Sequence, residues 1–536
     1  MRQPTFIILL RLSFFFLCTS YGCHSSTGKK QVKATVSHAD TLIKGNFNAA
    51  PQLKFDSAAI AAFLKKHPGL NGFAAEYAKF YLINKYHYVW YDNKGLTESA
   101  GNLINHVTIQ QNDGILKEIP YKEEFLQMNE SLQSGRIKLP SITVELMLTG
   151  QYFNYAKNVW GGAEAEKAKD IGWYLPRKKL SYTDLLAHNL KSDAGSMEQV
   201  AVIPQYMMLK KALNQYQQVE KAGPDILLPS KSPLNTLSPD DTSSLVIQLK
   251  NRLRQVGDST VNFSNVYDTL LISAVIRFKN RHGLKPDRKI NSAFLKQLNV
   301  PLHKRINQII VNLERMRWIP ADDHGGEFLL VNIPEFKLHY YKNNSPDWAC
   351  NVVVGKSMTK TVIFSGHLQY IVFSPYWYIP PSIIQKEIKP GIARKPNYLS
   401  NHRMEWNGGN VRQLPGKENS LGLVKFIFPN SNNIYLHDTP SKSLFNEDVR
   451  AFSHGCIRVE KPEELAELLL KQNTAWTTQK IRAAMNRGVE QSVVLKQKIP
   501  VYIGYFTAFV DHTGTLNFRD DIYQRDEPLL KMLMKP

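Results

Sequence analysis

SHGCIRVEKPEEL, residues 453–465, is the stretch of this 536-residue chain that decides its fold and its chemistry. Cys456 follows a glycine and lies two residues after His454, and Arg458 comes two residues later. Gly455 lets other groups approach the backbone closely, so amides near the cysteine are free to bind an oxyanion. The pattern is typical of a tight polar turn built around a reactive thiol.

A partner for this thiol is predicted further up the chain. A thiol is a weak nucleophile until it loses its proton, and an imidazole within hydrogen-bond reach can remove that proton. His437 lies nineteen residues before Cys456 and follows the apolar stretch NNIYL, which predicts a strand end. His454 is closer in sequence, but next-but-one neighbours on an extended chain share a face without necessarily touching. We therefore expect His437 to be the base.

The N-terminus, residues 1–23, reads MRQPTFIILLRLSFFFLCTSYGC. Arg2 precedes an apolar run that is too short to span a bilayer, which predicts an export signal and a periplasmic location. SYGC, residues 20–23, also resembles a lipoprotein signal with Cys23 as the acceptor. Plain signal cleavage is the alternative, and a lipid on Cys23 is the one membrane attachment we expect.

Export leaves two cysteines in the mature chain, Cys350 and Cys456. In an oxidising compartment they could form a disulfide. Cys350, however, lies in WACNVVVGK, a β-branched run typical of a buried strand, whereas Cys456 lies in a polar turn beside His454. This difference favours two free thiols.

The composition indicates a globular protein of several domains. The chain is 43% hydrophobic and 21% charged, and it is too long for one hydrophobic core. Its net charge of +21 favours a polyanionic partner such as cell wall, with a merely solvated basic surface as the alternative. The sequence contains no zinc-ligand spacing, nucleic-acid-binding motif or phosphate-binding loop, so we expect no metal, cofactor or nucleic-acid partner.

The periodicity along the chain predicts a multidomain α+β fold. The expected parts are a helical domain (40–235), a small three-helix unit (242–300), a connecting helix (301–322), a mainly β domain (323–505) and a C-terminal tail (506–536). Within the β domain, residues 391–422 are long, polar and turn-rich, which is typical of a lid, with a passive surface loop as the alternative.

Two motifs resemble known families. The signature of the L,D-transpeptidase (YkuD-type) catalytic domain is matched in order by His437, Ser453, His454, Gly455, Cys456, Ile457 and Arg458. Arg458, together with the stretches FSPYWYIP and NLERMRW, resembles the large subgroup of this family that carries a helical scaffold domain. The small three-helix unit resembles a peptidoglycan-binding module through Ala274, Val275, Phe278, His282, Gly283 and Leu284. A plain helical packing unit is the alternative for this module.

The resemblance implies a reaction at Cys456. The thiol would attack the carbonyl at the L-centre of meso-diaminopimelate in a peptidoglycan tetrapeptide stem, releasing D-Ala and leaving a thioester. The amine of a second stem would then form a 3→3 cross-link. His437 would serve as general base and then general acid, and backbone amides at Gly455 and Cys456 would form the oxyanion hole. Carbapenem β-lactams would acylate the same thiol.

The resemblance also implies roles for the flanking residues. Ser453 and His454 belong to the catalytic motif. Arg458 would hold a stem carboxylate, with a surface salt bridge to Glu460 or Glu463 as the alternative. Tyr376 and Trp377 either line the groove or belong to the core.

Two other functions remain open from the sequence. A carboxypeptidase or hydrolase would use the same acyl-enzyme and let water attack it. A non-catalytic peptidoglycan-binding protein would have lost Cys456 or His437, and both are present.

Overall fold

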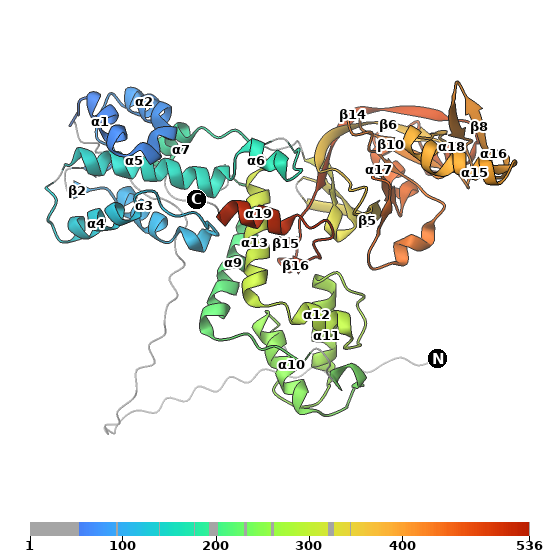
Figure 1. Ribbon diagram of the computed structural model, residues 1–536, viewed down its shortest axis with the longest axis horizontal. Coiled ribbons are helices and arrows are strands. Elements are labelled where there is room, and N and C mark those ends of the chain that lie inside the picture. The colour runs from blue at the N-terminus through green and yellow to red at the C-terminus, as the bar shows by residue number, and fades with distance from the viewer. Residues whose placement is uncertain are drawn as a thin grey trace, which may run out of the picture. The chain divides into compact units, whose positions relative to one another are not determined.

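The structure is a computed structural model that describes residues 53–534, except 93–94, 139, 176, 192–201, 230–232, 259–261, 320–325 and 344 (Figure 1). The expected export signal and lipid acceptor, residues 1–23, lie outside the described residues. Within the described residues, no helix combines the length and the apolar character needed to cross a membrane.

The first part of the described chain is helical. Its helices are α1 (Ala58–Lys66), α2 (Ala74–Ile83), α3 (Glu98–Thr108), α4 (Lys122–Gln133), α5 (Ile142–Ala156), α6 (Ala165–Asp170), α7 (Tyr182–Asn189) and α9 (Pro204–Ala222), and β1 (Tyr91–Asp92) pairs with β2 (Gly95–Leu96). Helix α5 is buried along most of its length. Its carboxylate Glu145 accepts hydrogen bonds from the Tyr81 hydroxyl (2.8 Å) and the Val89 amide (2.9 Å), and burial raises its pKa to about 7.

A small unit of three helices follows, consisting of α10 (Ser244–Gln255), α11 (Thr269–Arg281) and α12 (Ser292–Leu298). Side chains of Ser243, Asp268 and Asn291 cap the three N-termini by accepting amide hydrogen bonds. Phe278 is buried, and His282 stacks on it with ring centroids 3.8 Å apart. Of the motif residues quoted above, Ala274, Val275, Phe278 and His282 are buried in this unit's core.

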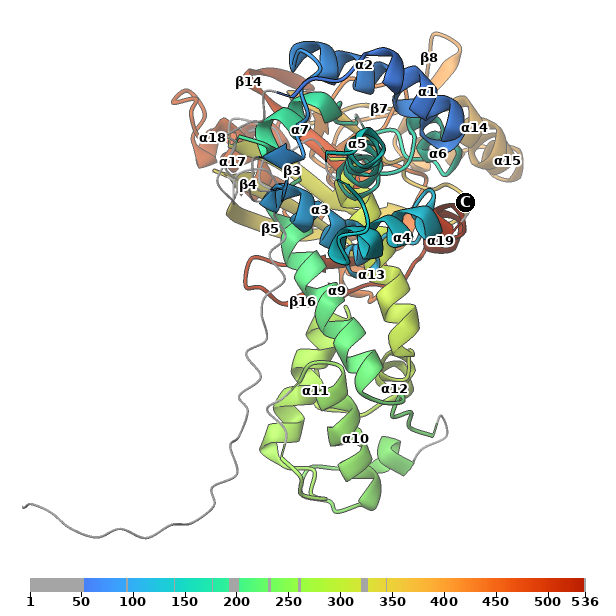
Figure 2. The same ribbon diagram turned by 90° about the vertical axis from the view of Figure 1, so that its left-hand side faces the viewer.

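Helix α13 (Leu302–Arg317) runs beside α9, as both views show (Figures 1 and 2). Arg317 near its end donates to the Tyr206 hydroxyl of α9 (3.1 Å) and to the Asp113 carbonyl (2.9 Å). These buried contacts join α13 to the helical region.

Among the described residues, the β domain is built on a nine-stranded sheet in the order β12-β5-β13-β11-β10-β6-β14-β3-β4. A further pairing of β4 with β5 closes this sheet on itself. The strands are β3 (Glu327–Asn332), β4 (Lys337–Lys342), β5 (Ser345–Gly355), β6 (Phe364–Phe373), β10 (Val424–Ile427), β11 (Leu436–His437), β12 (Ala451–Ser453), β13 (Ile457–Val459) and β14 (Gln491–Gly504). Helices α17 (Pro462–Leu470) and α18 (Thr478–Asn486) follow β13.

The segment between β6 and β10 folds as a lobe with its own small hydrophobic cluster of Ile379, Ile384, Ile388 and Val411. It contains a separate three-stranded sheet in the order β7-β9-β8. Its elements are β7 (Trp377–Tyr378), α14 (Pro381–Ile383), the π-helical turn η6 (Ile384–Ile388), α15 (Lys389–Arg394), α16 (Tyr398–Asn401), β8 (Met404–Asn407) and β9 (Asn410–Gln413). Residues 391–422, expected as a lid, are therefore part of a larger folded lobe.

The last part of the chain is also folded. Strands β15 (Ala508–Val510) and β16 (Leu516–Phe518) form a hairpin, and α19 (Asp526–Met534) ends the described chain. Asn312 of α13 donates to the Thr507 hydroxyl (2.7 Å) and accepts from the Thr507 amide (2.9 Å). The segment 506–534 is thus attached to α13 by buried hydrogen bonds.

Candidate active site

Residues Ser453–Cys456 form the turn between β12 and β13, which we call the catalytic turn. Gly455 has a φ of +123°, a conformation that side chains rarely adopt. The Ser453 hydroxyl accepts from the Gly455 amide (3.1 Å) and donates to the Cys456 carbonyl (2.6 Å). Ser453 therefore stabilises the turn with both hydrogen bonds. The amides of Gly455 and Cys456 were the two expected oxyanion donors, and the Gly455 amide is already occupied by Ser453.

The strand register brings His437, expected as the base, and Arg458 to one face of the sheet. Strands β11 and β13 are parallel, with Leu436 opposite Ile457 and His437 opposite Arg458. Leu436 and Ile457 are buried on one face. Since side chains alternate along a strand, His437, Cys456 and Arg458 share the other face.

His437 is held as a neutral base. Its Nδ1 lies 2.5 Å from the Asp438 carbonyl, which can only accept, so Nδ1 carries the hydrogen and Nε2 keeps its lone pair. Burial first, and then the positive charge of Arg458, lower the pKa of His437 to about 3. The ring is therefore uncharged at neutral pH and able to take a proton.

Cys456 rests as a thiol. Burial raises the pKa of its thiol, while hydrogen bonds from Tyr435 and the charge of Arg458 oppose that rise. Sγ donates to the Asn433 carbonyl at 3.7 Å. Deprotonation of the thiol therefore needs a base, and His437, on the same face of the sheet, is the candidate. Cys350, in β5, is also a free thiol, and burial raises its pKa to about 12.

Tyr435 is a site residue that the sequence reasoning missed. Its ring lies 5.7 Å from that of His437, edge to face, and it hydrogen-bonds with Cys456. Burial raises the pKa of the Tyr435 hydroxyl, which keeps it a donor. The signal available in the sequence was its position two residues before His437, on the same face of the strand.

The side chain of Arg458 is partly buried beside the thiol. Its Nε is buried and has no hydrogen-bond partner among the described residues. Of the two carboxylates weighed as alternative partners, Glu463 pairs with Arg482 and Glu460 accepts from the Asn351 amide. The geometry leaves the guanidinium available to an anionic ligand.

The remaining predicted residues face the lobe. His454 Nε2 pairs with Glu387 of η6 at 3.2 Å, and both side chains are about half exposed. The Tyr376 amide donates to Glu490 (2.9 Å), and Arg412 lies over the Tyr376 ring at 4.2 Å. Trp377, in β7, packs against the lobe's hydrophobic cluster.

The site offers side chains for acyl transfer. Within the described residues, no group of three or more His, Cys, Asp or Glu side chains is arranged to hold a metal ion. A thiol, a neutral imidazole and the free amide of Cys456 together provide a nucleophile, a base and an oxyanion donor.

Three regions of the chain match protein-family models. Residues 326–494 match the L,D-transpeptidase catalytic domain (YkuD), residues 75–213 the scaffold domain and residues 242–298 the "Putative peptidoglycan binding domain". The chain therefore carries a YkuD L,D-transpeptidase catalytic domain, a scaffold domain and a peptidoglycan-binding domain.

The chain is also similar in part to proteins and solved structures that carry names. A Haemophilus influenzae protein named "Putative L,D-transpeptidase" is 34% identical over 254 residues, which are 43% of this chain and 51% of that protein. The match thus spans about half the length of that curated relative. An L,D-transpeptidase structure from Stackebrandtia nassauensis is 12% identical over 53% of this chain and 100% of its own, with a TM-score of 0.21. A carbamoyl enzyme of Ldtfm with avibactam is 14% identical over 34% of this chain and 50% of its own, with a TM-score of 0.20. The assignment of the three domains depends on the matches to family models.

Proposed function

We propose that this protein is a peptidoglycan L,D-transpeptidase that forms 3→3 cross-links through a thioester on Cys456. The observation that carries the proposal is the parallel β11–β13 register, in which His437 lies opposite Arg458, two residues after Cys456. A neutral imidazole that can take a proton and a thiol that must lose one are the two groups that general-base activation of a nucleophile requires.

The proposed reaction proceeds in two acyl transfers. His437 takes the proton from Sγ of Cys456, and the thiolate attacks the carbonyl of the third stem residue. The oxyanion accepts a hydrogen bond from the Cys456 amide. The C–N bond to D-Ala then breaks, and its amine leaves with the proton held by His437. In the second half, the amine of another stem attacks the thioester, passes a proton to His437, and releases the thiol.

The test is to incubate the purified protein with disaccharide tetrapeptides and to analyse the products by mass spectrometry. The proposal expects 3→3 dimers and free D-Ala from the wild type and none from Cys456→Ala. Cys350→Ala is the matched control, because it removes the other free thiol and should keep the activity. Tripeptides without dimers would identify a hydrolase instead, and dimers from Cys456→Ala would remove this cysteine from the mechanism.

The lobe that follows β6 is proposed to act as a lid over the catalytic turn. The contact between His454 and Glu387 supports this role, because it joins the turn to the lobe through two side chains that remain accessible to solvent. Trp406 in the β8–β9 hairpin is 55% exposed, as expected for a side chain that meets a ligand rather than the core.

Replacing residues 403–412 by a short Gly/Ser linker should slow carbapenem acylation of Cys456 at least tenfold. Trp406→Ala tests substrate contact without removing Val411 from the lobe's cluster. An unchanged acylation rate in both variants, with unchanged thermal stability, would make the lobe a passive insertion.

We further propose that the protein is exported and acts at the cell wall. The N-terminal sequence and the net charge of +21, which suits an anionic polymer, support this location. Fractionation of cells should place the mature protein in the periplasm, and metabolic labelling with a lipid precursor should mark Cys23 if it is the acceptor. A cytoplasmic protein that still carries residues 1–22 would contradict export.

A further inference from the structure

The loop that follows β5, residues 356–361, lies directly against the catalytic turn. The Lys356 amide and the Thr359 hydroxyl both donate to the Ser453 carbonyl, each at 3.0 Å. The loop folds back over Gly355 so closely that a Cβ there would lie 2.0 Å from the Thr359 carbonyl oxygen. A glycine is therefore required at the end of β5 for this loop to reach the turn.

Thr361 connects this loop to the nucleophile. Its side chain is fully buried, and its hydroxyl accepts from the Gly355 amide (2.9 Å) and donates to the Gly455 carbonyl (2.9 Å). The single hydroxyl hydrogen is therefore committed to the peptide group that joins Gly455 to Cys456.

Fixing that carbonyl also fixes the amide of the nucleophile. The peptide between Gly455 and Cys456 is planar and trans, so its C=O and N–H point in opposite directions. Because Thr361 holds the C=O on the buried side, the Cys456 N–H is directed away from Thr361. Among the described residues this N–H has no hydrogen-bond partner, whereas the Gly455 amide is engaged by Ser453. The Cys456 amide is thus the donor left for an oxyanion.

Tyr523, from the C-terminal segment, supports Thr361. Its hydroxyl donates to the Gly355 carbonyl (2.6 Å) and accepts from the Thr361 amide (3.3 Å). Its own backbone is held at both ends, since its amide donates to the Tyr505 hydroxyl (2.8 Å) and its carbonyl accepts from Lys360 (3.0 Å). Tyr523 is 2% exposed, so these contacts lie in the interior.

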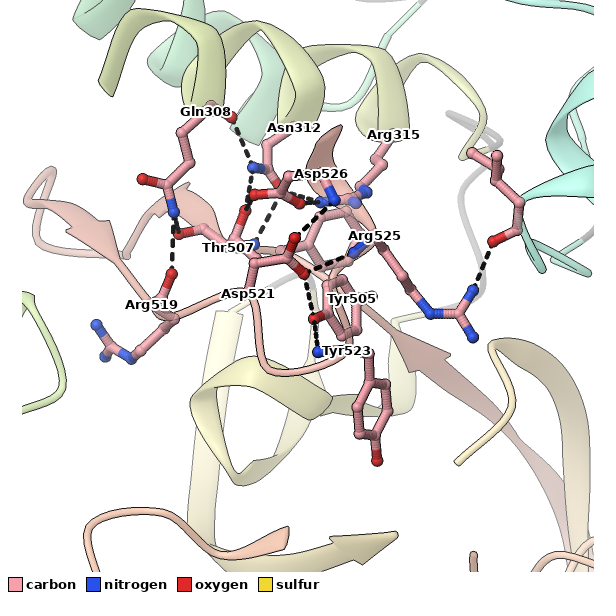
Figure 3. Close-up of polar contacts among 12 residues, drawn as sticks. Gln308, Asn312, Arg315, Tyr505, Thr507, Arg519, Asp521, Tyr523, Arg525 and Asp526 are labelled. Carbon is pink, nitrogen blue, oxygen red and sulfur yellow. Dashed lines mark hydrogen bonds and ion pairs between the residues drawn. The ribbon is translucent and has the colours of Figure 1, made fainter. Parts of the chain in front are cut away.

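Buried polar contacts anchor the segment that carries Tyr523 (Figure 3). Asp526 accepts from Arg315 of α13 and from the Thr507 hydroxyl, each at 2.6 Å. Arg525 donates to the carbonyls of Ile171 (2.6 Å) and Gly172 (3.2 Å), which follow α6. The position of Tyr523 is therefore set by helix α13 and by the helical region as well as by the sheet.

We propose that Thr361 is a positioning residue that aims the Cys456 amide at the oxyanion, and that Tyr523 keeps Thr361 in place. This inference rests on the proposed acylation of Cys456. It assigns to the segment beyond the sheet a part in acyl transfer that acts through Thr361.

The test compares two reactions of the same thiol in the full-length protein. Acylation by a carbapenem passes through an oxyanion, whereas alkylation by iodoacetamide needs the thiolate alone. Thr361→Val keeps the shape and removes the hydroxyl, so it should slow acylation about ten- to a hundredfold, somewhat less than deleting an oxyanion donor outright. Alkylation should stay within about twofold of the wild type, and Thr361→Ser should restore acylation.

A second pair of variants keeps the test decisive if Thr361→Val folds poorly. Tyr523→Phe should lower acylation in the same selective way, but less. Tyr340→Phe is the matched control, because it removes a buried tyrosine hydroxyl from β4 and should leave both rates unchanged.

The outcomes separate the inference from the function on which it rests. Equal acylation in Thr361→Val and wild type, or equal losses of acylation and alkylation, would overturn the positioning role while leaving the function intact. A wild type that carbapenem does not acylate at Cys456 would overturn the proposed function, and the inference with it.

Discussion

His437 and Arg458 are direct partners across the parallel β11–β13 pair, so a guanidinium lies beside the imidazole on one face of the sheet. The charge of Arg458 lowers the pKa of His437 and also that of Cys456. One side chain therefore keeps the base neutral and favours the thiolate, in addition to any contact it makes with a ligand.

Replacing Arg458 with Gln should move the pH–rate profile of carbapenem acylation. Without the positive charge, the pKa values of both His437 and Cys456 rise, so both limbs should shift upward, by roughly 1 pH unit. Arg458→Lys keeps the charge and should keep the profile. Limbs that stay in place in Arg458→Gln would show that burial alone sets the two pKa values.

The depressed pKa of His437 also predicts how stability depends on pH. Folded His437 has a pKa of about 3 against an ordinary value of 6.5, so between these values the unfolded chain binds more protons. The free energy of unfolding should therefore fall as the pH drops below about 6.5, with a contribution of up to ~1.4 kcal/mol per pH unit from this residue.

His437→Gln cannot titrate, and its denaturation midpoint should fall less steeply with pH than that of the wild type. The difference between the two curves isolates His437 from other buried histidines such as His282. Parallel curves over this pH range would show that His437 does not titrate on unfolding.

Ser453→Ala should destabilise the catalytic turn. The change leaves the Gly455 amide and the Cys456 carbonyl without their partner, at a cost of about 1–3 kcal/mol. Urea denaturation should show this loss together with slower acylation, and Ser453→Thr, which keeps the hydroxyl, should recover both. Full stability in Ser453→Ala would mean that another group satisfies the turn.

The two histidines should differ strongly on substitution. His437→Ala removes the base and should lower the acylation rate by about 10²–10⁴-fold. His454 is half exposed and pairs with Glu387, so His454→Ala should cost about tenfold or less. The measurement is the acylation rate constant of each variant at saturating carbapenem. Equal losses in the two variants would mean that His437 is not the base.

Cys456 and His437 could be predicted as the nucleophile and its base because both lie within one local pattern of the sequence. His437 follows a predicted strand, and Cys456 lies in a Gly-containing turn nineteen residues later, so both can be recognised from neighbouring residues. The helical periodicity of α11 around Phe278 is recognised in the same way. His437 is preferred over His454 as the base because His437 lies at a predicted strand end, whereas His454 and Cys456 are next-but-one neighbours that need not touch. This argument needs no tertiary information.

Contacts between distant segments could not be predicted in this way. Tyr523 meets Gly355 across 168 residues, and Thr361 meets Gly455 across 94. The sequence predicts residues 506–536 as a C-terminal tail, whereas residues 508–518 form a hairpin and residues 526–534 form a helix. The partners on α13 that hold this segment, Asn312 and Arg315, are far away in the sequence. The lobe between β6 and β10 could be predicted only in part. Its turn residues at 391–422 are evident in the sequence, but the small hydrophobic cluster that unites it with residues 379–388 is not.

The buried hydrogen bond between Tyr523 and Gly355 has a consequence for the order of folding. Its two partners are 168 residues apart, and the strands of the nine-stranded sheet all lie before Tyr523 in the sequence. A chain that stops before Tyr523 would therefore contain every strand of this sheet and still lack the support that holds Thr361.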